Sequence, residues 1–337
     1  MPIFVRRSGK NFHMADSSSA SSPGLPASSL RPSKVSPQQA KYIEKIEVAL
    51  GKGNLTIVVG AGVSISAIQA SKRMSKDNLL RVTESMSRIG VLQHGLDYLE
   101  EEGFSLNSAD KSELDTYKRT LETNLSSSED ILRTASFLKR KLVESKKLDN
   151  WFDLEFEGIY DKCINRDANP ILDAMKELYN SGARIITTNY DDLLDKHIGG
   201  NTIISDGTPA LKRFFRKMDT GICHVHGIWW HSKGAVLDNM DYQRTLQDDT
   251  LQQDLKNSMS SSEILLFVVG LDDPNFSHLL SWAANQNDGL AQRHCVLARH
   301  GESIDTTLHG LNVLRYGTEF EDLPGFLMRI TQKSQRT

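Results

Sequence analysis

Short apolar runs alternate with amphipathic stretches along most of the chain. Six runs have the length and composition of strands: 55–60, 183–189, 221–227, 263–270, 294–300 and 312–317. Stretches with a helical spacing of apolar residues lie before, between and after them: 37–50, 170–180, 191–197, 241–257, 275–285, 303–309 and 322–333. Strands that are separated by helices pair in parallel and carry helices on both faces. The pattern therefore predicts an α/β fold with a doubly wound parallel sheet.

The segment from about 77 to 150 differs from this alternation because its pattern is helical throughout. It carries few strand signals, and an acidic half over 100–130 precedes a basic half over 133–147. Such a segment is typical of a helical insertion. We therefore expect one Rossmann-like α/β domain over 37–335, with an inserted helical module at about 77–150.

Composition limits the classes of partner. With 337 residues, 39% of them hydrophobic, the chain can bury a sizeable core. The formal net charge of -3 gives no general attraction to nucleic acid or to anionic lipid. No apolar run reaches the roughly 18 residues that a membrane-spanning helix requires. We therefore expect neither a nucleic acid nor a membrane as a partner.

The cysteines and the first 36 residues indicate where in the cell the protein is expected. Cys163, Cys223 and Cys295 are far apart, so they build neither a disulfide framework nor a CxxC zinc clip. A reducing compartment follows, and we expect a cytoplasmic location. Residues 1–36 are rich in serine and poor in large apolar groups, which predicts a disordered tail. The basic beginning of that tail is open to three interpretations: an organelle address, a basic tail or an expression remnant.

Three polar clusters follow predicted strands, where ligands collect in sheets of this kind. The first is Gly60-Ala61-Gly62-Val63-Ser64. A Gly-Ala-Gly turn lets backbone amides approach a diphosphate, and the next helix directs its positive end at the same charge. Ile65 stands where the full dinucleotide fingerprint has its third glycine. The incomplete fingerprint therefore gives no reason to expect a hydride-transfer dehydrogenase. A close-packed strand–helix corner is the alternative interpretation.

The second cluster is Thr187-Thr188-Asn189-Tyr190-Asp191, and the third is His224-Val225-His226-Gly227. Asn189 and Asp191 are able to contact a sugar and an amide, or to cap the following helix. The two histidines lie two residues apart and share a face if the strand continues through them. A histidine is often a structural hydrogen-bonding group, but His226 stands before a glycine at the rim of the sheet, where imidazole acts as a general base near neutral pH.

In this order, the three clusters resemble the motifs of the sirtuin superfamily of NAD-consuming proteins, over about residues 54–330. The resemblance implies that the GAG-x-S turn binds pyrophosphate and ribose, that the T-x-N-x-D segment surrounds the nicotinamide ribose, and that His226 is a base. It implies catalytic roles for His226, Asn189 and Asp191. The residues that it places against NAD are Gly60, Ala61, Gly62, Ser64, Thr188, Gly227, Gly270, Asp272 and Tyr316.

Some of these assignments have structural alternatives. Asp272 is expected at the adenosine ribose, but it is also suited to cap a helix over 275–285. Tyr316 ends the last predicted strand, where it either flanks the adenine or packs in the core. Trp229 and Trp230 follow the histidine cluster, and paired aromatic residues there are more typical of a core or an interface than of a cleft.

The sequence lacks several motifs of sirtuin deacetylases, and these differences point to another branch of the superfamily. The sequence lacks the proline-aspartate-phenylalanine-arginine stretch after the glycine turn, and no cysteine lies between His226 and Glu263 to form the two zinc-binding CxxC pairs. Gly270-Leu271-Asp272-Asp273 stands where deacetylases carry a GTS turn. The chain is more similar to the zinc-less, sirtuin-like NAD hydrolases of bacterial antiphage systems and their animal and fungal relatives.

That resemblance implies cleavage of NAD to nicotinamide and ADP-ribose without a metal. It also implies a homo-oligomer, either a tetramer or a filament, and regulation by self-assembly in an immune or stress response. Two other classes stay open. One is an NAD-dependent protein deacylase or ADP-ribosyltransferase, and the other is a non-catalytic NAD or ADP-ribose sensor or assembly scaffold.

Overall fold

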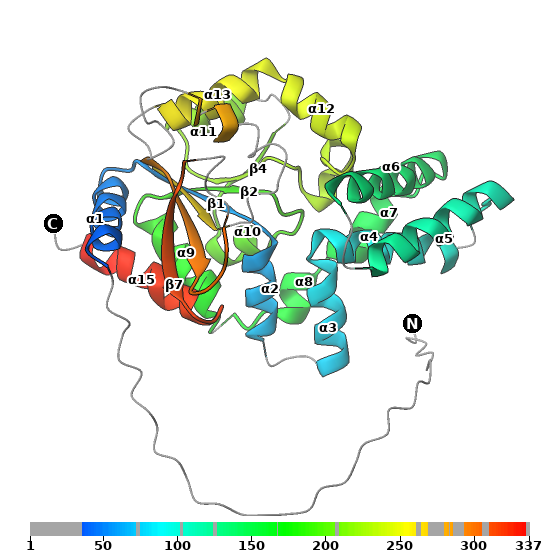
Figure 1. Ribbon diagram of the computed structural model, residues 1–337, viewed down its shortest axis with the longest axis horizontal. Helices are drawn as coiled ribbons and strands as arrows, with labels where there is room; N and C mark the ends of the chain where they lie inside the picture. Colours follow the sequence, from blue (N-terminus) through cyan, green and yellow to red (C-terminus); the bar gives the residue numbers. More distant parts are fainter. Residues whose placement is uncertain are drawn as a thin grey trace, which may run out of the picture. The chain divides into compact units, whose positions relative to one another are not determined.

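Figure 1 shows the fold of the protein in a computed structural model. The structure describes residues 36–71, 75–101, 104–123, 127–166, 168–205, 209–260, 264–268, 280–282, 284–285, 293–304 and 310–334. Seven strands form one sheet in the order β3-β4-β2-β1-β5-β6-β7, and all of its neighbouring strands are parallel. The strands are β1 Leu55–Val59, β2 Arg184–Thr187, β3 Thr202–Ile204, β4 Ile222–His224, β5 Ile264–Val268, β6 Cys295–Arg299 and β7 Asn312–Gly317. The predicted Rossmann-like parallel sheet is confirmed.

Helices cover both faces of the sheet because successive strand residues point to opposite sides. In β1, Ile57 and Val59 belong to one buried cluster and Val58 belongs to another. In Figure 1, α1, α9 and α15 lie on one side of the sheet, and α11 and α13 lie on the other. The helices around the sheet are α1 Pro37–Gly51, α2 Ala61–Gln69, α9 Pro170–Asn180, α10 Leu193–Ile198, α11 Pro209–Phe215, α12 Asn239–Gln247, α13 Asp249–Ser260 and α15 Asp322–Ser334.

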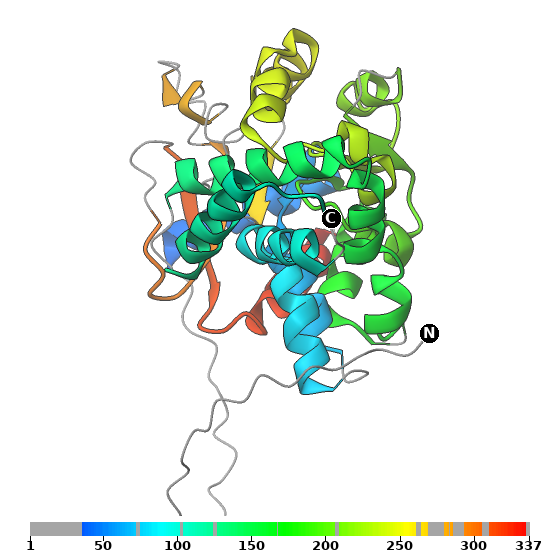
Figure 2. The same cartoon turned by 90° about the vertical axis from the view of Figure 1, so that its right-hand side faces the viewer.

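The helical pattern predicted near 77–150 is also confirmed. This part of the chain contains α3 Lys76–Ser85, α4 Arg88–Glu101, α5 Ser108–Glu122, α6 Ser128–Glu144 and α7 Leu148–Phe156, and α8 Ile159–Cys163 follows. We call α3 to α7 the helical module; its helices face the viewer in Figure 2. Capping boxes begin two of them, with Asn107 and Asp110 at α5 and with Ser127 and Asp130 at α6.

The core of the module is continuous with one face of the sheet. Leu96, Leu138 and Trp151 are fully or almost fully buried and belong to the same cluster as Ile57. Close helix packing requires a small residue at Gly95, where a Cβ would lie 2.3 Å from Cδ2 of Leu138. The module is therefore packed into the core as part of it.

Several elements differ from the sequence prediction. The short strand β3 and helix α11 were not predicted, and three residues of strand carry too little pattern to stand out. The helix expected over 241–257 is two helices, because Asp248 leaves the helical conformation (φ -74°, ψ 91°) and its carboxylate accepts the amide of Leu251 in α13. The tail and most of the helices expected at 275–285 and 303–309 lie outside the described residues. No helix in the described part of the chain is long and apolar enough to cross a membrane.

Candidate functional site

The glycine turn joins β1 to α2. Gly60 precedes the first residue of α2 in an extended conformation (φ -125°, ψ -170°). Gly62 lies in the first turn of the helix, and a Cβ there would meet no atom within 4 Å. The fold itself would therefore tolerate a side chain at Gly62. Gly62 is therefore not required by close packing, and the approach of a diphosphate to this helix N-terminus stays a prediction.

Asn189 connects the ends of β1 and β2. Its Nδ2 donates hydrogen bonds to the carbonyl oxygen of Gly60 (3.2 Å) and to Oγ of Ser64 (2.9 Å). The hydroxyl of Ser64 donates in turn to Oδ2 of Asp191 (2.7 Å), and Oδ1 of Asp191 accepts the amide of Leu193 at the start of α10 (3.1 Å). Asp192 is the N-cap residue of α10 and makes no side-chain capping bond; the preceding Asp191 accepts the amide of Leu193 instead. The first two predicted clusters form one hydrogen-bonded network.

Burial raises the pKa of Asp191 to about 6. The hydrogen bonds from Ser64 and from the amide of Leu193, and the nearby His224, act in the opposite direction, while Asp192 adds to the rise. The side chain is 5% exposed, so few water molecules remain to solvate a charge. The site therefore holds a carboxylate that titrates close to neutral pH.

Asp191→Asn is expected to stabilise the protein at pH 7.5 and to lose that advantage at pH 4. A raised pKa in the folded state means that the stabilising contribution of the protonated carboxyl is complete below the unfolded pKa of about 3.9 and is lost as the pH rises through about 6. At pH 7.5 the variant is expected to gain roughly 2 kcal/mol in free energy of unfolding. Urea unfolding of both proteins at the two pH values measures this difference, and an equal difference at both would contradict the assignment.

The two histidines of the third cluster have different surroundings because β4 ends at His224. The ring of His224 is 1% exposed, with Nδ1 3.1 Å from the carbonyl oxygen of Asn189 and Nε2 2.9 Å from Oδ2 of Asp195. His226 lies beyond the strand, and its ring meets that of Tyr242 edge-on at 5.4 Å between centroids. The condition for a shared face, a strand that continues through both residues, is not met. His224 lies beneath the site, and His226 lies in it.

A pocket opens over the ends of β1, β2 and β4. Its cavity volume is about 110 Å³, which is smaller than the roughly 300–1,000 Å³ of typical small-molecule sites. Of the predicted site residues, Ala61, Thr188, Asn189, Asp191 and His226 line it. The pocket is also lined by residues that were not predicted: the module residues 85–88, Phe156, Leu237 and Tyr242. No short motif marks them, because tertiary packing alone brings them to the pocket.

The other predicted residues lie elsewhere. Ser64 supports Asn189 and Asp191 from behind the pocket wall. Gly227 has a φ of +80°, and a Cβ there would come within 3.0 Å of the backbone of 234–235, so the turn after His226 requires glycine. Tyr316 is buried in the main core, as its packing alternative expects. Gly270 and Asp272 lie outside the described residues, and the roles of all these residues toward NAD stay predictions.

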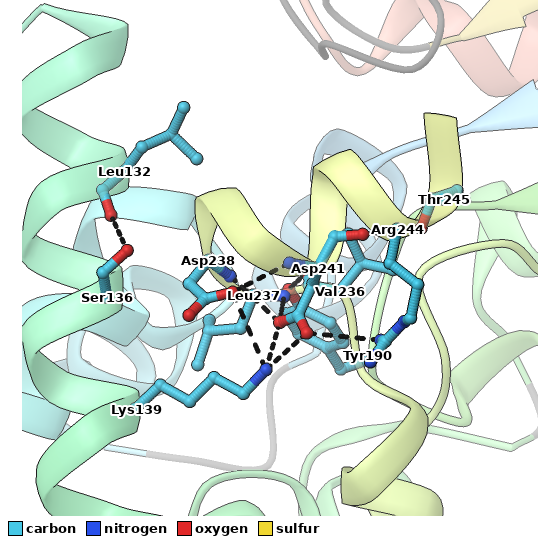
Figure 3. Close-up of polar contacts among 10 residues, drawn as sticks. All are labelled: Leu132, Ser136, Lys139, Tyr190, Val236, Leu237, Asp238, Asp241, Arg244 and Thr245. Atoms are coloured by element: carbon cyan, nitrogen blue, oxygen red, sulfur yellow. Dashed lines mark hydrogen bonds and ion pairs between the residues drawn. The ribbon is translucent and has the colours of Figure 1, made fainter. Parts of the chain in front are cut away.

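A partly buried ion pair joins the helical module to the segment that follows His226 (Figure 3). Lys139 of α6 contacts Oδ2 of Asp241 at 2.5 Å, and the same carboxylate oxygen accepts the amides of Leu237 and Asp238. Burial opposes ionisation, but the ammonium of Lys139 and these amides lower the pKa of Asp241. The contact joins α6 to the neighbours of Leu237 and Tyr242, both of which line the pocket.

These features define an α/β protein with a pocket at the carboxyl ends of its central strands. Residues 183–315 match the family model of the SIR2-like domain, and this match supports membership of the sirtuin-like superfamily. The matched range runs from the residue before β2 into β7, so it includes Asn189, Asp191 and His226 and excludes the glycine turn and the helical module. A SIR2-like domain implies a function that uses NAD. Among the described residues, no group of three or more His, Cys, Asp or Glu side chains has a metal-binding arrangement.

Proposed function

We propose that the protein is an NAD hydrolase that cleaves the nicotinamide N-glycosidic bond to give nicotinamide and ADP-ribose. One observation carries this proposal: an imidazole from the end of β4, an amide from the end of β2 and the first residue of α2 line the same pocket. The match to the SIR2-like domain adds the expectation that the ligand is NAD. The open space at Gly62 supports a diphosphate above the first turn of α2.

The reaction requires a stabilised ribosyl cation and an oriented water molecule. Both N–H groups of the Asn189 amide are used within the protein, by Gly60 and Ser64, which leaves Oδ1 to accept a hydrogen bond from a ribose hydroxyl or from water. As the glycosidic bond breaks, its electron pair leaves with nicotinamide. Water then adds to the ribosyl carbon and gives its proton to His226. Asp191 would hold the ribose or the carboxamide.

The resemblance to the zinc-less branch supports three further parts of the proposal. The reaction would need no zinc, the chain would assemble into a tetramer or a filament, and assembly would regulate hydrolysis in an immune or stress response. A cytoplasmic location fits the scattered cysteines. Control of some kind is expected, because unregulated NAD cleavage is toxic to a cell.

Incubation of the purified protein with NAD alone tests the proposed reaction. We expect equal amounts of nicotinamide and ADP-ribose by chromatography, together with particles larger than a monomer by light scattering. Product formation only after an acylated peptide or another acceptor is added would identify a deacylase or a transferase. Binding of NAD without any product would identify a sensor.

A further inference from the structure

We propose that Arg88, at the start of α4 in the helical module, binds the phosphate attached to the nicotinamide ribose. The pocket would then select ribosides that carry a 5′-phosphate, with the nicotinamide mononucleotide half of NAD as the part that it recognises. This inference rests on NAD as the ligand, but it does not require that NAD be hydrolysed.

Arg88 lines the pocket together with His226 and Asn189. Its guanidinium carbon lies 5.5 Å from the centre of the Tyr242 ring, and that ring packs edge-on against His226 at 5.4 Å. Guanidinium, phenol and imidazole are thus successive neighbours along one wall. The module therefore supplies a cation to the pocket that contains the candidate base.

The guanidinium is incompletely satisfied within the protein. Its Nη2 is buried and has no hydrogen-bond partner in the described part of the chain. An arginine is always protonated, so a buried N–H without an acceptor is costly, and a phosphate oxygen is the acceptor that it binds most strongly. Stacking on Tyr242 holds the planar group in place before a ligand arrives.

The carboxylate of Asp191 lines the same pocket, but its oxygens contact Ser64 and the amide of Leu193. The pocket thus presents a cation from the module and an acidic group from the end of β2. The nicotinamide mononucleotide half of NAD has the matching polarity, with a cationic pyridinium and an anionic phosphate on one ribose. A uniformly anionic ligand would match only the guanidinium, and a neutral ligand would match neither group.

Affinity measurements in a His226→Ala parent, in which turnover is expected to be slow, test the inference. Isothermal titration calorimetry with nicotinamide mononucleotide and with nicotinamide riboside gives the contribution of the phosphate. We expect the phosphorylated compound to bind the parent about 10- to 100-fold more tightly. Adding Arg88→Met should reduce that ratio to near one, and Arg88→Lys, which keeps the charge but loses the planar fork, should give an intermediate ratio.

Arg81→Met is the matched control, because Arg81 is an exposed arginine of α3 in the same module. It should leave the ratio unchanged. Circular dichroism establishes that each variant is folded, and Arg88→Lys provides the comparison if Arg88→Met is not. A parent that binds the two compounds equally, or binds neither, would overturn the inference, as would an unchanged ratio in a folded Arg88 variant. Failure of the wild-type protein to release nicotinamide would overturn the proposed hydrolysis alone.

Discussion

Replacing His226 with alanine is expected to lower kcat for NAD cleavage by about 10²- to 10⁴-fold, the usual contribution of general acid–base catalysis. The ring is 3% exposed, lines the pocket and packs edge-on against Tyr242. No other imidazole lines the described pocket to take over the proton. Release of nicotinamide measured by chromatography over a range of NAD concentrations separates the effect on kcat from the effect on KM.

The fold should survive this substitution because the local backbone is held by other groups. The carbonyl oxygen of His226 accepts the amide of Val236 (2.9 Å), and the turn after it depends on Gly227. His231→Ala is the control, since His231 is an exposed histidine five positions further along and lies outside the pocket. Turnover at the wild-type rate in a folded His226→Ala protein would remove the base from the mechanism.

The convergence of the three clusters was predictable from the sequence because parallel strands all end at one edge of a sheet. The apolar runs located β1, β2 and β4, and the polar residues after them form the network of Asn189, Ser64 and Asp191. The length of each strand was less predictable. β4 stops at His224, so the two-residue alternation could not separate the roles of His224 and His226.

The contribution of the helical module to the pocket was not predictable, because it depends on contacts between segments that are distant in sequence. Arg88 and Tyr242 are 154 positions apart, and they meet where α6 packs against α4 on one side and contacts α12 through Lys139 and Asp241 on the other. Neither residue follows a strand, so the rule that located the other site residues does not apply to them. Their periodicity predicts a helix, and only the packed structure shows that the helix closes a pocket.

His224 and Asp195 form a buried pair that contacts the pocket residue Asn189. Both nitrogens of His224 face acceptors, the carbonyl oxygen of Asn189 and the carboxylate of Asp195. Oδ1 of that carboxylate accepts the hydroxyl of Thr202 at 2.5 Å. Two acceptors require two protons on the ring, so we expect His224 to be an imidazolium paired with Asp195. Burial opposes the charge, but Asp195 and the carbonyl of Asn189 raise the pKa of His224.

His224→Gln is therefore expected to lower the free energy of unfolding by about 3–5 kcal/mol at pH 6, because it leaves the Asp195 carboxylate buried without a counter-charge. The double variant with Asp195→Asn removes both charges and should be at least about 1 kcal/mol more stable than His224→Gln alone. Urea unfolding of the four proteins completes the cycle.

The pair of His224 and Asp195 also predicts how the free energy of unfolding changes with pH. Since the folded pKa of His224 is raised, its stabilising contribution is complete below the unfolded value of about 6.5 and is lost as the pH rises through the folded pKa. The difference in unfolding free energy between the wild-type protein and His224→Gln should therefore shrink at high pH. A difference that stays constant from pH 6 to pH 9, or a His224→Gln variant as stable as the wild-type protein at pH 6, would show that the ring is neutral. The carbonyl of Asn189 would then be held by an ordinary hydrogen bond instead of a buried cation.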